Sequence, residues 1–179
     1  MDLAEPYRQA VQMVLPDAAI VADKFHVIAL GQQALRKVRA GRRQRGNVAS
    51  LLDRGVERLS QGGRERLGEA LAADPRLATA WALKEELRGV YRSHTYQEAS
   101  TGLAQWFEAA KTSGLLPFAR VGGTIQRWRE EVLNYWHFPL TNALVEGKHN
   151  RVKALKRRAY GYRNDQVFLL RFLNLIHTD

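Results

Sequence analysis

The sequence predicts a mainly α-helical protein with a small β contribution, an α+β fold. Most of the chain carries apolar residues three and four positions apart, the spacing that is typical of amphipathic helices. Only residues 18–22 form a short apolar run of strand length, which Asp23 closes. With 179 residues, of which 45% are hydrophobic, the chain has room for one domain, with or without an insertion, and for a real core.

The first predicted elements are a helix and a strand. Pro6 stands where the first turn of a helix tolerates proline, and Pro16 ends that helix. The apolar face repeats at helical spacing through Tyr7, Ala10, Val11, Val14 and Leu15. The strand at 18–22 follows. Because a helix that leads into a buried strand implies an earlier partner strand, we expect the chain to begin in the middle of a sheet, with that partner ending at Asp2.

The middle of the chain predicts a succession of helices. One begins at Val27 and leads into a basic run, which is either a solvated linker or a DNA-backbone contact; the run comprises Arg36, Lys37, Arg39, Arg42, Arg43 and Arg45. A short helix over 51–59 is expected to be closed by Gly62 and Gly63, and a second one to extend to Asp74. From 76 to 91 the helical spacing is carried by Leu77, Ala80, Trp81, Lys84, Leu87 and Tyr91.

Two further helices are predicted before the C-terminal segment. Thr95 and Glu98 fit a capping box, which would open a helix that extends to Gly114. Leu115 and Pro117 open a last long helix whose inward residues include Phe118, Ile125, Trp128, Val132 and Trp136. We interpret the tryptophans as core residues, because an aromatic stripe at helical spacing is the ordinary pattern of a helix packed on a core.

A single carboxylate, Glu146, begins the most informative segment of the chain. Asn142 is a suitable N-cap for the helix that contains it. On that helix Glu146, His149 or Asn150, Lys153 and Arg157 share one face, because residues three and four apart are neighbours. The face has two interpretations. It is either a solvated surface on which the acid relieves cationic crowding, or a metal-binding carboxylate beside a track for phosphates.

The residues that follow favour the second interpretation. Residues 156–164 interleave cations with Tyr160 and Tyr162 around Gly161. Lys and Arg neutralise phosphates, and tyrosine rings stack on exposed bases. Gly161 is expected to end the helix, and Asn164 or Asp165 to cap a terminal one that carries Val167, Phe168, Leu169, Phe172, Leu173 and Ile176.

Residues 141–164 resemble the segment around the last catalytic glutamate of bacterial insertion-sequence transposases of the DDE class, the ISL-three group. That group carries Thr/Ser-Asn-x-x-Val-Glu-Gly-x-x-Asn and then Lys-Arg-Arg-Ala-Tyr-Gly-Phe/Tyr-Arg-Asn. The run from Thr141 to Asn150 and the run from Lys156 to Asn164 match both. Segments at 81–85, 127–135 and 23–27 are similar to the family as well, so the resemblance covers nearly the whole chain.

The resemblance implies a fold for the chain and a division of the chain into three parts. It implies an RNase H-like core interrupted by a large all-helical insertion. Residues 1–27 would be a partial RNase H-like half with one helix and one strand, and residues 28–138 the insertion. Residues 139–179 would complete the core with the catalytic-glutamate helix and the C-terminal helix.

The resemblance also implies the chemistry. Two Asp and one Glu of such enzymes hold two divalent metals, Mg²⁺ or Mn²⁺, on either side of a scissile phosphate, and carboxylates suit magnesium because it prefers hard oxygen ligands. By this alignment Asp2 and Glu146 would be the catalytic metal ligands, and Asp23 with His26 would support the site. In an alternative register Asp23 is the metal ligand; from residue spacing alone, Asp23 is equally an acid that caps the next helix beside a packed His26.

DNA, as transposon ends, is the partner that the resemblance implies. The expected DNA-binding residues are Lys148, Asn150, Arg151, Lys153, Lys156, Arg157, Arg158, Tyr160, Tyr162 and Arg163. The first catalytic Asp of the family would precede Met1, as would its zinc-binding and helix-turn-helix segments. We therefore expect a truncated transposase that binds metal weakly and is inactive alone. The alternative is a stand-alone basic helical DNA-binding module, or a regulator that associates with a full-length transposase; association with its own copies is a further expectation.

The net charge of the chain limits the classes of molecule that it is expected to bind. The formal charge is +10 and the isoelectric point about 10.3, as for a protein that binds a polyanion. No stretch approaches the roughly 20 apolar residues that cross a bilayer, and the N-terminus lacks the pattern of a signal peptide. There are no cysteines, so disulfides and thiolate zinc sites are excluded. We expect a bacterial cytoplasmic location at the nucleoid and no membrane partner.

Overall fold

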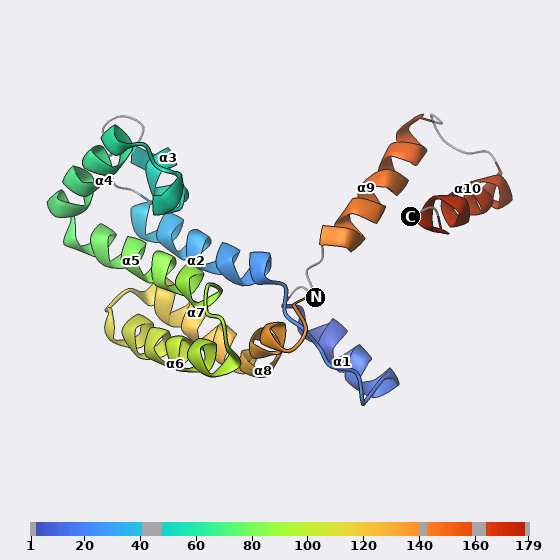
Figure 1. Ribbon diagram of the computed structural model, residues 1–179, viewed down its shortest axis with the longest axis horizontal. Helices are drawn as coiled ribbons and strands as arrows, with labels where there is room; N and C mark the ends of the chain where they lie inside the picture. Colours follow the sequence, from blue (N-terminus) through green and yellow to red (C-terminus); the bar gives the residue numbers. More distant parts are fainter. Residues whose placement is uncertain (1–2, 41–47, 140–142, 159–163, 178–179) are drawn as a thin grey trace. The chain divides into compact units, whose positions relative to one another are not determined.

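The computed structural model describes residues 3–40, 48–139, 143–158 and 164–177 (Figure 1). Within these ranges the ordered elements are helices, and no strand occurs, so the prediction of a mainly α protein is confirmed. The chain divides into two compact units, Met1–Leu140 and Thr141–Asp179, and each is described by itself. No helix in the described ranges combines the length and apolar character needed to cross a bilayer.

The elements of the first unit follow the predicted succession of helices. In chain order they are α1 (Glu5–Val14), α2 (Lys24–Arg39), α3 (Val48–Asp53), η1 (Val56–Arg58), α4 (Gln61–Ala73), α5 (Pro75–Val90), α6 (Tyr96–Thr112), α7 (Leu116–Arg127), α8 (Arg129–Leu133) and η2 (Asn134–Trp136). The second unit contains α9 (Ala143–Arg158) and α10 (Asp165–His177).

Four long helices build the core of the first unit. α5 packs between α2 and α6, and α7 packs on α2 and α6, so each of the four contacts two others (Figure 1). Their facing sides bury Leu35, Leu87, Leu103, Trp106, Phe118 and Ile125. Gly31 permits the close approach of α2 to α5, because a Cβ at this position would lie 3.1 Å from Leu87 Cδ2. The short helices α3 and α4 pack on each other, and α4 also packs on α5.

Side-chain caps begin several of these helices. Thr95 Oγ1 accepts from Glu98 N at 3.2 Å, which confirms Thr95 as the cap; Glu98 Oε2 accepts from His94 N at 2.9 Å, one residue before the N-cap whose N–H a capping box would engage. The prediction that Gly62 and Gly63 close a helix is wrong. Both lie in the first turn of α4, because Ser60 Oγ accepts from Gly63 N at 3.3 Å and caps that helix.

The predicted strand at 18–22 is not formed in the described structure. Among the described residues, this irregular segment bonds to the end of α8 and the start of η2. Ala22 N donates to Glu131 O at 2.8 Å, and Asn134 Nδ2 donates to Ile20 O at 2.9 Å. A strand requires a hydrogen-bonded ladder, and no second extended segment faces these residues within the described ranges. The RNase H-like core therefore remains an expectation.

The last long helix of the first unit is shorter than predicted. It breaks at Trp128, whose φ of −107° and ψ of 20° leave the helical region, and α8 and η2 continue after the break. Trp106 and Trp128 are buried as predicted, while Trp81 and Trp136 are half-buried at the edge of the core.

The second unit is a pair of helices in contact, α9 and α10. Asn164 Oδ1 accepts from Gln166 N at 2.9 Å and from Val167 N at 3.3 Å, which confirms Asn164 as the cap of α10. The predicted cap Asn142 and the predicted helix end at Gly161 lie outside the described residues.

Candidate nucleic-acid interface

The basic surface of α9 is the first component of the candidate site. Its exposed cations are Arg151, Lys153, Lys156, Arg157 and Arg158. None of them forms an ion pair with a carboxylate of the described residues. Leu155, which is half-buried, lies opposite Lys153 and Arg157, whereas Arg151 and Arg158 lie four and three residues from Leu155 on its own side of the helix. The exposed cations therefore surround much of the helix, and those opposite Leu155 are open to a ligand.

The spacing of α9 aligns these cations with the predicted carboxylate. Glu146, Asn150, Lys153 and Arg157 follow one another at intervals of three and four residues along one stripe of the helix. Eleven residues of helix rise about 16 Å, so the stripe spans several phosphates of a nucleic-acid strand. The backbone of Glu146 lies in the first turn, where a carboxylate is favourable, and the cations gather in the last turn, where they are favourable too.

Neighbouring cations on α9 repel one another. Lys153 lies three residues from Lys156 and four from Arg157, and like charges at this spacing destabilise an isolated helix by about 0.2–0.5 kcal/mol per pair. A bound polyanion would remove this repulsion. The arrangement would therefore suit a ligand that carries several phosphates.

Several predicted site residues lie outside the described structure. These are Asp2, Tyr160, Tyr162 and Arg163, together with the side chains of Glu146 and Lys148. The predicted metal pair, Asp2 with Glu146, therefore stays a prediction. Among the side chains that are described, no group of three or more His, Asp and Glu could hold a metal ion.

Asp23 and His26 meet on the first turn of α2, as predicted. Asp23 is only 2% exposed, and its Oδ1 accepts from Phe25 N at 2.7 Å, so this carboxylate caps the helix. His26 Nδ1 lies 4.0 Å from the same Oδ1, and the imidazole is partly exposed. This is the helix cap that residue spacing alone predicted for Asp23, and the supporting role of the pair stays a prediction.

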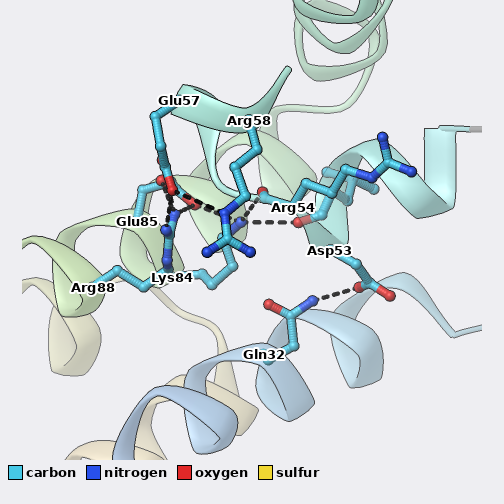
Figure 2. Close-up of polar contacts among 9 residues, drawn as sticks. Gln32, Asp53, Arg54, Glu57, Arg58, Lys84, Glu85 and Arg88 are labelled. Carbon is cyan, nitrogen blue, oxygen red and sulfur yellow. Dashed lines mark hydrogen bonds and ion pairs between the residues drawn. The ribbon is translucent and has the colours of Figure 1, made fainter. Parts of the chain in front are cut away.

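A second polar cluster, not predicted from the sequence, surrounds Lys84 of α5 (Figure 2). Lys84 is 1% exposed, and its Nζ donates to Leu52 O at 2.9 Å and to Arg54 O at 3.0 Å. These carbonyls belong to the C-terminal end of α3, which carries a partial negative charge. Glu85 Oε1 lies 2.6 Å from the same ammonium. Burial lowers the pKa of Lys84, and its hydrogen bond with Glu85 opposes that shift.

Arg88 extends this cluster to η1. Its guanidinium donates to Glu85 at 2.7 and 2.8 Å and to Glu57 Oε1 at 2.5 Å (Figure 2). The hydrogen bond from Arg88 lowers the pKa of Glu57 to about 2. Gln32 of α2 donates to Asp53 Oδ1 at 2.5 Å. The cluster ties the short helices to α2 and α5, and we assign it a structural role.

Residues 1–172 match the family model of the ISL3-type DDE transposases, whose description is "Transposase". The chain belongs to this transposase family. It is 30% identical to the transposase for insertion sequence element IS1001 of Bordetella parapertussis, over 96% of this chain and 45% of that protein. It is 28% identical to the transposase for insertion sequence element IS1557 of Mycobacterium tuberculosis, over 94% of this chain and 45% of that protein.

The transposase-family chain thus spans less than half the length of the curated relatives it matches. No solved structure matches it.

Proposed function

We propose that this chain supplies the DNA-holding, glutamate-bearing part of a DDE transposase. Glu146 is one of the carboxylates of the catalytic centre, and Asp2 is a second. The cations of α9 hold the DNA backbone beside them. The observation that carries the proposal is the stripe of α9, which aligns Glu146 with two cations that have no carboxylate partner among the described residues.

The cations and the carboxylates of the site would have different roles. Lys153 and Arg157 bind phosphates of the strand that lies along the stripe, and Arg151 and Arg158 bind on the adjoining side of the helix. Asp23 and His26 hold the start of α2. When bound, Mg²⁺ or Mn²⁺ would supply Lewis acidity and an activated oxygen nucleophile, and the carboxylates of Asp2 and Glu146 fit such hard cations.

We further propose that this chain alone binds DNA without cleaving it. The family chemistry requires three carboxylates, and the resemblance assigns two to the residues of this chain. Hydrolysis and strand transfer would then require a full-length transposase of the family. Association with full-length transposase or with its own copies is part of the proposal.

Salt-dependent DNA binding tests the role of α9. Lys153→Ala and Arg157→Ala should each reduce the slope of log K against log salt by about 1, because each removes one phosphate contact. Arg64→Ala removes an exposed cation of α4 and is the matched control, which should leave the slope unchanged. Equal slopes for all four proteins would refute the proposal.

The alternative is a stand-alone DNA-binding module, favoured by the compactness of the second unit. Both functions predict binding that survives Glu146→Gln. They differ in their predictions for cleavage by a full-length transposase that contains this segment. A catalytic Glu146 predicts that Glu146→Gln abolishes strand cleavage with Mg²⁺ or Mn²⁺, whereas a binding module predicts no effect. Efficient cleavage of terminal-repeat DNA by the present chain alone would contradict the proposed inactivity.

A further inference from the structure

We propose that a partly exposed set of aromatic rings on the first unit binds an unpaired nucleobase. The set, called here the ring platform, comprises the exposed Phe25, Tyr96, His137 and Phe138 and the half-buried Tyr135, with Lys24 among the rings. The inference rests on the proposed function in taking DNA as the ligand. It adds a second DNA site, separate from α9, that recognises a base and not the backbone.

The ring platform stands on a rigid base. Tyr91 stacks on Trp136 with ring centroids 5.3 Å apart, and its edge meets Tyr135 at 5.5 Å. Trp136 Nε1 donates to Ser93 O at 3.0 Å. These contacts fix η2 on the end of α5. The rings that follow Trp136 are therefore held in place before any ligand arrives, which lowers the entropic cost of binding.

The outer rings leave surface for a ligand. Tyr96 and His137 stack at 4.8 Å between centroids, and Phe138 lies 6.5 Å from His137. Phe138 is 46% exposed and Tyr96 39%. Flat, partly exposed rings bind bases of any sequence, because every base has a π-face.

Lys24 connects this group to Phe25. Its Nζ donates to Tyr135 Oη at 3.1 Å and lies 5.2 Å from the Tyr135 centroid and 5.4 Å from that of Phe25. Phe25 is 59% exposed. The ammonium group has further donors that can reach a phosphate, so one cation lies between two rings, as in surfaces that bind single-stranded DNA.

The composition of the ring platform favours a base over an apolar protein partner. Residues 134–138 and 24–25 offer phenol, imidazole, phenyl and ammonium groups, and no large aliphatic side chain. The buried carboxylate of Asp23 caps α2, so it does not present an exposed negative charge to a polyanion. Exposed apolar chains gather elsewhere, at the C-terminal end of α1, as Met13, Val14 and Leu15.

DNA with a single-stranded tail tests the inference. The full chain should bind a tailed duplex more tightly than the blunt duplex, and an abasic tail should lose the difference. Phe138→Ala and Phe25→Ala should each weaken tailed-duplex binding by about 5- to 150-fold, the range for one base–aromatic stack. Phe138→Trp should keep it. Leu116→Ala, which truncates an exposed apolar side chain on α7, is the matched control.

A comparison of the tailed and blunt duplexes distinguishes this inference from the proposed function of α9. Lys153→Ala and Arg157→Ala should weaken tailed and blunt duplexes alike, whereas the ring variants should affect the tailed duplex alone. If the chain does not bind the blunt duplex but still binds the tailed duplex, the proposed role of α9 is refuted, whereas the inference about the ring platform holds. Equal affinity for tailed, abasic and blunt DNA would overturn the inference. So would a change of oligomeric state in Phe138→Ala by sedimentation, since the rings would then hold a second copy of the chain.

Discussion

Replacing Lys84 with methionine should destabilise the first unit substantially. Methionine fills a similar volume but cannot donate, so Leu52 O and Arg54 O lose their buried donor. An unsatisfied buried acceptor costs about 1–3 kcal/mol, and relief of the buried charge returns part of the loss. We expect a net loss of about 2–4 kcal/mol in the free energy of unfolding, since two carbonyls are affected. For a chain of this size that lowers Tm by roughly 4–16 °C.

Urea denaturation and thermal melting followed by circular dichroism measure this loss. Lys111→Met, at an exposed position of α6, is the matched control and should change stability by less than about 0.5 kcal/mol. Glu85 keeps Arg88 as a partner in the Lys84→Met protein, so the effect reports on the carbonyls of α3 and not on a stranded carboxylate. A Lys84→Met protein as stable as the Lys111→Met protein would refute this account.

Three further changes test other contacts. Glu57 has a folded pKa of about 2 against a usual 4.5, so the stability it contributes is present above pH 4.5 and is lost as the pH falls towards 2; Glu57→Gln should flatten the pH dependence of Tm in that window. Thr95→Ala should lower the free energy of unfolding by about 1 kcal/mol, measured in urea, because it removes the cap of α6, while Thr95→Ser should retain most of it. Arg8→Ala should speed amide exchange in α1 and leave α5 unchanged, because Arg8 joins α1 to Arg127 O at 3.1 Å and to the ring of Trp128 at 4.6 Å; equal exchange in α1 of both proteins would contradict that anchoring role.

Helices were predictable because their signals are local. The apolar spacing over 76–91 identified α5, and Thr95 with Glu98 marked the start of α6. Prediction from local sequence failed where two signals at neighbouring positions indicated different structures. Gly62 and Gly63 resemble a helix end, but Ser60 caps the helix that contains them, and this cap decides the outcome.

Contacts between distant segments were beyond sequence reasoning. The spacing placed Lys84 on the apolar side of its helix, but its acceptors lie 30 and 32 residues earlier in the chain. The apolar run at 18–22 has strand composition, yet its partners are Glu131 O and Asn134, more than 100 residues away. The surface of α9 was predictable since one helix holds all its cations, whereas the rings of the ring platform come from separate segments.

The distribution of charge connects the fold to the candidate site. In the first unit, several cations have carboxylate partners: Arg8 with Glu131, Arg36 with Asp53, and Arg88 with Glu57 and Glu85. α9 differs from the first unit in its excess of positive charge. Its sequence holds six Lys or Arg and one Glu, which gives a net charge of +5, half of the +10 of the whole chain. Ion pairs within the protein are what we expect of cations that serve to stabilise the fold. The exposed cations of α9 have no carboxylate partner among the described residues, and the proposed binding of DNA would explain this excess of positive charge.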